Sequence, residues 1–229
     1  MAAQLDRDAL EAALLGALGA VNADTLKRVL AALGDPPDPA RLTPELWAEI
    51  EVATRGALQP ALENAFLAAA EAASADAGIG IAWDTVNVRA ADWARQYSFD
   101  LVRGINDNSR TMLQQTVSSF LETPTTNAAL QEKIARVFGA SRANVIAATE
   151  LTRATSEGEL AAAASIRDSL QGTGITLIPV WLTSVDDRTC VICGPRHEKR
   201  QGDGWEFPPP AHPGCRCYLR HDVLTPVSE

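Results

Sequence analysis

The chain has 229 residues, which is enough for one large domain or two small ones with a buried core. Hydrophobic residues make up 46% of it, with alanine a large share of them, and aromatic residues only 5%, so the composition favours helices and argues against a β-rich fold. With 20 Lys and Arg against 29 Asp and Glu, the net charge is −9. We therefore expect no strong non-specific binding to nucleic acid, because phosphates are neutralised by clustered cations.

The N-terminal segment does not have the pattern of a targeting sequence. It carries Asp6, Arg7 and Asp8 where a signal peptide has a cationic run followed by an apolar stretch. The longest apolar stretch, residues 12–21, is too short and too rich in glycine and alanine to span a bilayer. We expect a soluble protein in a reducing cytoplasm with no membrane partner, where cysteines serve metal or redox chemistry more often than disulfides.

The first part of the chain predicts helices separated by a proline-rich break. Residues 5–33 predict one helix or two short ones, with a break near residues 19–22. The three prolines within residues 35–39 cannot continue a helix and predict a linker. Thr43 then has the character of an N-cap, with Pro44 at the first position of the next helix.

Further helices are expected through the middle of the chain. Pro60 should kink or interrupt the helix that begins at Pro44, and residues 77–88 are expected to be extended or irregular. Apolar residues at helical spacing then predict one helix ending near Gly104, a second that stops before Pro124 and a third closed by Gly139.

The character of the sequence changes after a last long helix, which Ser141 is expected to cap and which should run to about Gln171. Residues 176–184 are β-branched and apolar and predict a strand, placed at an edge or bulge by Pro179. A turn and a polar loop follow, and residues 215–223 alternate as a second strand should.

These elements predict a mainly α protein in which Ala-rich helical N-terminal and middle regions precede a small C-terminal β-hairpin module (α+β). Along the chain we expect an N-terminal helical region at residues 1–104, a second helical region at residues 105–175, and a Cys-rich β module at residues 176–229.

All cysteines and histidines of the chain lie in this last region. Cys190 and Cys193 have the spacing of a zinc knuckle, in which a two-residue turn lets both thiolates reach one ion. Cys215 and Cys217 would project from the same face of a strand, and a short hairpin would bring the two pairs together. Four sulfur ligands suit Zn²⁺ in a closed tetrahedral site, which predicts a structural ion.

Other arrangements of these residues remain open. His212 lies three residues before Cys215 and could replace one cysteine, although four cysteines are the preferred set. A pair of disulfides, or free thiols in a core, are the alternatives to a metal site, and a thioredoxin-like redox site lacks the expected βαβ context. Trp181 and Trp205 flank the cysteines and are expected to pack around them.

The order of these features is specific. A helix begins near Ser141-Arg142 and contains Thr149-Glu150-Leu151-Thr152-Arg153-Ala154; a strand with Trp181 follows; then come Asp187-Arg188-Thr189-Cys190-Val191-Ile192-Cys193 and Pro209-Pro210-Ala211-His212-Pro213-Gly214-Cys215-Arg216-Cys217. This order resembles the domain of phage Mu F-like minor head proteins, which also occurs in head-morphogenesis proteins of tailed phages that infect Gram-positive hosts. The resemblance covers about residues 126–219.

The resemblance implies a low-copy capsid component made in the cytoplasm of a bacterial host. Such proteins associate with the portal vertex, mostly inside the head, and act in head assembly or genome delivery, so the portal protein and other head proteins are the implied partners. We expect residues 5–104 to bind a portal subunit and the Cys-rich module to form a compact head inside the capsid.

Two other functions compete with this one, a zinc-dependent nuclease or toxin-like enzyme and a regulatory zinc-binding adaptor. We expect no enzyme, because a closed four-ligand site leaves no position for an activated water. Glu150 could contact the metal module, but an ion pair with Arg153 three residues on is the preferred interpretation. Asp186 and Asp187 are expected to form a turn and not a catalytic carboxylate pair.

Overall fold

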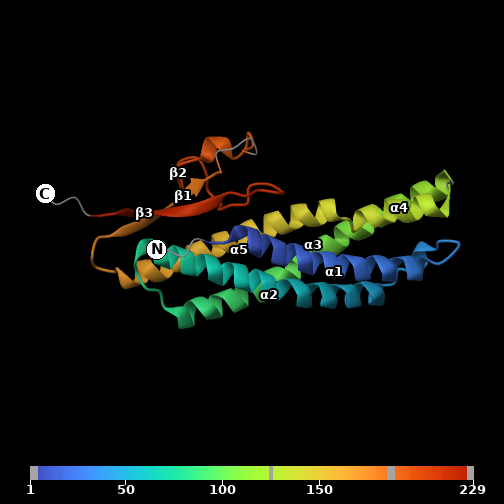
Figure 1. Cartoon of the computed structure of the whole chain (residues 1–229), viewed down its shortest axis with the longest axis horizontal. Coiled ribbons are helices and arrows are strands. Elements are labelled where there is room, and N and C mark those ends of the chain that lie inside the picture. Colours follow the sequence, from blue (N-terminus) through green and yellow to red (C-terminus); the bar gives the residue numbers. More distant parts are fainter. Residues whose placement is uncertain (1–4, 124–125, 185–188, 226–229) are drawn as a thin grey trace. The chain divides into compact units, whose positions relative to one another are not determined.

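The computed structural model describes residues 5–123, 126–184 and 189–225 (Figure 1). It confirms a mainly α fold with a small β module at the C-terminal end. The helices are α1 (Arg7–Leu33), α2 (Pro44–Ala77), α3 (Trp83–Glu122), α4 (Asn127–Val137) and α5 (Ala140–Ser169), and the strands are β1 (Thr176–Leu182), β2 (Lys199–Arg200) and β3 (Tyr218–Leu224). Two 3₁₀ turns, η1 (Pro39–Arg41) and η2 (Gly194–Arg196), lie in the connections.

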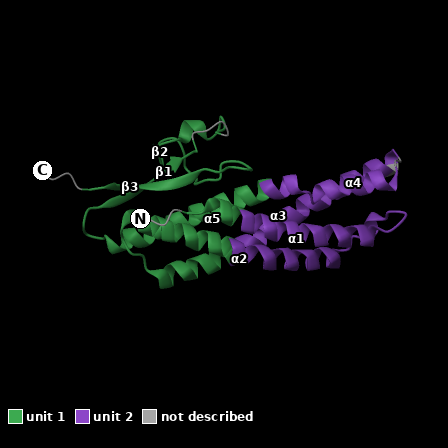
Figure 2. Ribbon diagram, viewed as in Figure 1, with its two compact units in different colours: residues 1–11, 62–94, 145–229 green, residues 12–61, 95–144 purple. Residues whose placement is uncertain are grey.

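Packing divides the chain into two compact units (Figure 2). Unit 1 consists of Met1–Glu11, Leu62–Ala94 and Val145–Glu229, and unit 2 of Ala12–Ala61 and Arg95–Asn144. Each unit is thus assembled from stretches that are distant in the sequence. The three consecutive regions expected from the sequence, residues 1–104, 105–175 and 176–229, therefore remain a prediction.

The proline-rich linker and the cap that follows it are confirmed. Between α1 and α2, the Asp38 side chain accepts a hydrogen bond from the Ala40 N–H and caps η1. The Thr43 hydroxyl accepts one from the Leu46 N–H at 3.4 Å, and α2 begins at Pro44. α1 itself is one continuous helix through residues 19–22.

Two predicted interruptions are wrong, and the irregular segment expected at residues 77–88 is shorter than predicted. α2 continues through Pro60, α3 continues through Gly104, and α3 already begins at Trp83, so only residues 78–82 lie outside the helices there. Leu58 and Leu62, on either side of Pro60, are almost fully buried. Burying such side chains offsets the cost of a missing N–H or of a glycine in a helix, which is about 1–3 kcal/mol.

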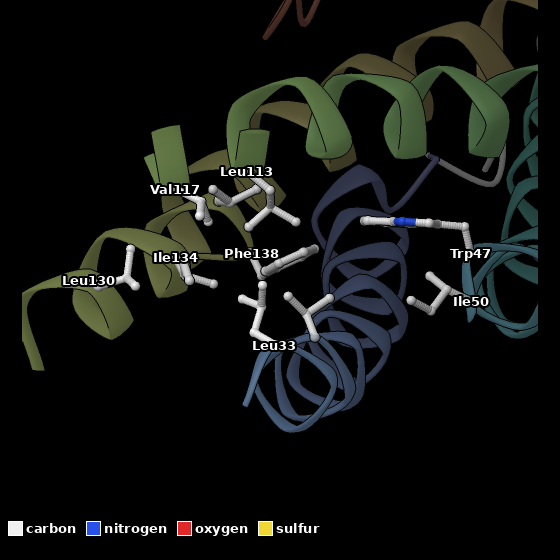
Figure 3. Close-up of a cluster of buried hydrophobic side chains, with 10 residues drawn as sticks. Leu33, Trp47, Ile50, Leu113, Val117, Leu130, Ile134 and Phe138 are labelled. Atoms are coloured by element: carbon white, nitrogen blue, oxygen red, sulfur yellow. The ribbon is translucent and has the colours of Figure 1, made fainter. Parts of the chain in front are cut away.

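One apolar core lies within unit 2. It joins α1, α2, α3 and α4, and Figure 3 shows Leu33, Leu113 and Ile134 gathered around Phe138, the C-cap of α4. Arg142 at the start of α5 donates to the Ser109 hydroxyl and to the Ile105 and Val137 carbonyls, which ties α5 to α3 and α4. The N-terminal end of α5 is thereby placed by polar contacts as well as by burial.

A second core lies within unit 1, where α5 approaches α2 closely. A Cβ atom at Gly158 would lie 2.1 Å from the Phe66 carbonyl oxygen, so the two helices approach at a distance that only glycine permits. Ala162 and Ile166 continue this face of α5, and Leu177 of β1 packs on the same cluster. The sheet is therefore positioned on the C-terminal half of α5.

The sheet has three antiparallel strands in the order β2-β1-β3. β1 and β3 pair along their length, from Thr176 opposite Leu224 to Leu182 opposite Tyr218. β2, which lies in the predicted polar loop, pairs Lys199 with Trp181.

Two expectations about the sheet are wrong. β1 is the central strand and not an edge, and Pro179 is tolerated because β2 ends before it reaches this position. The Pro179 carbonyl accepts from the Gln201 N–H, just after β2. β3 begins only at Tyr218, so Cys215 and Cys217 precede the strand and do not lie within it.

α1 is, among the described residues, the one helix long and apolar enough to cross a membrane by length and composition. The sequence expectation considered only residues 12–21, whereas the helix has 27 residues and an 18-residue window of mean hydropathy 1.2. Only 17% of that window is buried, although Leu14, Leu18, Val29 and Leu33 are, and both a core helix and an N-terminal signal sequence pass the same test.

The close approach at Gly158 predicts that alanine destabilises the protein there, whereas alanine at a control glycine should stabilise it. Gly158→Ala should destabilise the protein by about 1–3 kcal/mol, because the added methyl group meets the backbone of Phe66. Gly56→Ala, on the exposed face of α2 with nothing within 4 Å, should stabilise it by about 0.5–1 kcal/mol. Urea denaturation of both variants measures this, and equal effects would refute the proposed packing of α5 on α2.

Candidate metal centre

Four of the five candidate ligands are carried by two short turns, and Cys217 lies between the second turn and β3. In the first, the Cys193 N–H donates to the Cys190 carbonyl at 3.2 Å, and in the second the Cys215 N–H donates to the His212 carbonyl at 3.2 Å. Pro213 and Gly214 occupy the middle of the second turn, and Gly214 has φ +74°, as the third position of a type II turn requires. The sequence His-Pro-Gly-Cys therefore forms this turn for local reasons.

His212 faces the first turn. Its Nε2 lies 3.1 Å from the Cys190 Sγ and 3.3 Å from the Cys193 Sγ. Its Nδ1 lies 2.8 Å from the Pro213 carbonyl oxygen, to which it can only donate. In the neutral imidazole this hydrogen bond leaves the Nε2 lone pair directed at the two sulfur atoms, which is the arrangement of a metal-binding histidine.

The five predicted ligands come together as two overlapping groups that could hold a metal ion. One comprises Cys190, Cys193 and His212, the other Cys193, Cys215 and Cys217, and within each group the ligand atoms lie within 4.8 Å of one another. Cys193 belongs to both, and its Sγ is 3.8 Å from that of Cys215. All four cysteines are free thiols, and 3.8 Å is far longer than a disulfide bond.

Hydrogen bonding and burial separate the pKa values of these thiols. A hydrogen bond from the Cys217 thiol, above all, lowers the pKa of Cys215 to about 5, despite its burial. Burial raises the pKa of Cys193 to about 12, and the hydrogen bond to Cys215 together with burial raises that of Cys217. For Cys190, burial acts against the backbone N–H donors of Cys193 and Ile192, and the result is a lowered pKa.

An apolar shell surrounds the sulfur atoms. Cys193, Cys215 and Cys217 are buried with Trp181, Trp205 and Leu219, and the two indole rings meet edge to face with centroids 5.6 Å apart. The Trp205 Nε1–H donates to the Lys199 carbonyl, which anchors its loop to β2. This confirms that the tryptophans pack around the cysteines, and the shell keeps water from this part of the site.

Two threonines of α5 hold the second turn. The Thr149 hydroxyl accepts from the Gly214 N–H at 2.8 Å, and the buried Thr152 hydroxyl donates to the Cys215 carbonyl at 2.6 Å. The Thr149 hydroxyl donates in turn to the Val145 carbonyl, so its hydrogen-bonding capacity is used on both sides. The helical motif and the cysteine motif of the sequence are therefore in direct contact.

A partly buried arginine and a buried carboxylate lie next to these threonines. Arg7, at the start of α1, donates to the Thr152 and Thr155 hydroxyls, both at 3.0 Å. Glu159, one turn further along α5, accepts from the Leu219 N–H at 3.0 Å. Burial raises the pKa of Glu159 to about 8, against the influence of that N–H and of Arg7.

Several sequence expectations can be compared with this geometry. Glu150 lies 3.6 Å from Arg153, so the ion pair is confirmed. The His197 Nδ1 accepts from the Thr183 N–H, and neither His197 nor His221 belongs to the two ligand groups. Asp186 and Asp187 lie outside the described residues.

Sequence reasoning did not identify Thr149, Thr152, Glu159 or Arg7 as parts of the site. The two threonines could have been found, because they stand three residues apart on one helical face within the motif. Arg7 could not have been, since its partners Thr152 and Thr155 lie 145 and 148 residues away.

Comparison of the chain with models of known protein families, with curated proteins and with solved structures finds no match. The conclusions drawn from this site therefore depend on its geometry and on the motifs of the sequence.

The hydroxyl group of Thr152 offers a direct test of the contact between α5 and the second turn. Thr152→Val keeps the shape of the side chain but leaves the buried Cys215 carbonyl without its donor, and should cost about 1–3 kcal/mol. Thr111→Val is the control, because its exposed hydroxyl bonds only the carbonyl of its own helix. Thermal melting of both variants distinguishes them, and an unchanged midpoint for Thr152→Val would contradict the contact.

Proposed function

We propose that the C-terminal module binds one structural Zn²⁺ ion. The observation that supports it is the approach of four thiols and one imidazole nitrogen in two groups that share Cys193, since thiolate and imidazole are the ligands that zinc prefers in closed tetrahedral sites. The first turn and His212 supply one side of the site, and Cys215 and Cys217 the other. The ion would join the turn before β2 to the turn before β3.

Zinc takes four ligands in such a site, and the chain offers five. His212 points its Nε2 at Cys190 and Cys193, which supports a set of three cysteines and His212. Cys217 lies with Cys193 and Cys215, which supports the four-cysteine set. In either set no position is left for water, and the ion would stabilise the fold without catalysing a reaction.

We propose further that the chain is a minor head protein of a tailed phage that acts in head assembly or genome delivery. The motifs that resemble the Mu F-like domain are joined by the Thr149 and Thr152 hydrogen bonds to residues 214 and 215. Helix motif and Cys-His motif thus form one structural element, which supports treating their co-occurrence as more than chance. A place near the portal vertex, mostly inside the head, follows from this resemblance.

The N-terminal helices are the proposed contact with a portal subunit. Within residues 5–104, large apolar side chains remain exposed on α2 and α3, with Val52 and Val88 each 62% exposed. Exposed apolar side chains of this size gain stability when another protein covers them. The net charge of −9 would at the same time keep the protein from adhering to packaged DNA.

The ligand set can be resolved by two substitutions in the metal-loaded protein. If three cysteines and His212 bind the ion, His212→Ala should lower zinc content and affinity sharply while Cys217→Ser keeps one zinc per chain; the four-cysteine set predicts the reverse. Co²⁺-substituted protein gives an independent spectroscopic reading of the number of sulfur ligands. A protein that carries both His212→Ala and Cys217→Ser, folds normally and keeps its full zinc content would show that neither residue binds the ion.

Portal binding is tested with point variants, because unit 1 needs residues 62–94 and a long N-terminal truncation would unfold it. Val52→Asp and Val88→Asp should each weaken binding to the portal protein of the same phage genome by about 10-fold or more, a change of about 1.4 kcal/mol. Val145→Asp, 44% exposed on α5 and outside residues 5–104, should bind normally. A full-length chain that does not bind the portal in size exclusion would rule the partner out.

A further inference from the structure

The first turn of α1 reaches the candidate metal centre through a chain of hydrogen bonds. Arg7 donates to the Thr152 hydroxyl, and Thr152 donates to the carbonyl of Cys215, one of the candidate ligands. The second guanidinium nitrogen donates to Thr155, one turn along the same helix. Two different nitrogens of the Arg7 guanidinium therefore bond two hydroxyl groups, an arrangement that the planar guanidinium presents directly, whereas a lysine would have to reach both hydroxyls from one nitrogen.

A second contact joins the start of α1 to the segment between Cys215 and Cys217. Arg216, between Cys215 and Cys217, donates to both carboxylate oxygens of Glu11, at 2.5 and 3.3 Å. Residues 1–11 belong to the compact unit that contains the cysteines, whereas the remainder of α1 belongs to the other unit. The start of α1 is thus bound to the metal module at two points, one partly buried and one more exposed.

Charge gives a reason for a partly buried arginine at this place. A Zn²⁺ ion with three thiolates and an imidazole carries a net charge of −1, and with four thiolates −2, and such a charge is costly inside an apolar shell. Burial lowers the pKa of Arg7, while the charges of Glu159, Glu11, Cys215 and Cys217 act in the opposite direction. A partly buried cation within the electrostatic reach of Cys215 and Cys217 offsets that negative charge.

We propose that residues 5–11 form a strap on the metal centre, in which Arg7 is a positioning residue that holds the Cys215 carbonyl through Thr152 and balances the charge of the bound ion. The strap and the ion stabilise each other. If docking of residues 5–11 raises the affinity of the site for the ion, then the bound ion must strengthen that docking by the same factor. This inference rests on the proposed metal centre and adds a stabilising link between that centre and α1.

The rate of zinc release tests the strap in the intact, zinc-loaded protein. With excess 4-(2-pyridylazo)resorcinol as the coloured chelator, Arg7→Met should release zinc about 10-fold faster than the unmodified protein, a change of about 1.4 kcal/mol. Arg7→Lys should fall between the two, because lysine keeps the positive charge but lacks the two separate nitrogens that bond Thr152 and Thr155. Lys27→Met removes an exposed cation from the same helix and should leave the rate unchanged.

Hydrogen exchange of the unmodified protein gives a second measurement that needs no variant. Removing the zinc should reduce the protection of the amides of Leu10 and Glu11, which are bonded within the first turn of α1, while those of α4 in unit 2 keep theirs. Equal zinc release from Arg7→Met and the unmodified protein, or equal acceleration in Lys27→Met, would overturn the strap but leave the metal site in place. A protein that binds no zinc would overturn both proposals.

Discussion

The contact between α5 and the His212–Cys215 turn is the constraint on which the rest of the C-terminal module depends. Two hydroxyl groups, on Thr149 and Thr152, fix the backbone at Gly214 and Cys215, and this places the Cys215 and His212 side chains opposite the Cys190–Cys193 turn. The helix can serve as a rigid support because Gly158 lets it pack directly against the backbone of α2. Leu177 and Leu219 then attach the sheet to the same helix, through apolar packing and through the Glu159 carboxylate.

Short sequence motifs predicted the parts of the site whose geometry depends only on neighbouring residues. Cys-x-x-Cys and His-Pro-Gly-Cys are turns whose geometry follows from their own residues, so the five candidate ligands were found from spacing alone. The reason given for Cys215 and Cys217 was wrong, since both precede β3, and the two still join the same ligand group because the turn and the start of the strand direct them there. The three-stranded sheet was predicted only as a hairpin, because two residues are too few to give β2 a recognisable pattern.

Long-range contacts account for what was missed. Arg7 contacts residues nearly 150 positions away, and no periodicity reports such a partner. Pro60 and Gly104 are helix breakers by propensity, but α2 and α3 continue through them because buried residues on both sides outweigh the local cost. For the proposed phage function, the useful result is that the helical and Cys-rich motifs are one structural element. The proposed strap would extend that element to the start of α1.

The central claim is that one metal ion organises the two turns, and native mass spectrometry of the full-length protein tests it most directly. The native protein should have a mass higher than that of the polypeptide by one zinc ion, and the excess should disappear when the protein is denatured in acid with a chelator. Removal of the ion should also expose all four thiols to a thiol reagent. A native protein at the mass of the polypeptide alone, still folded and with its thiols protected, would contradict the claim.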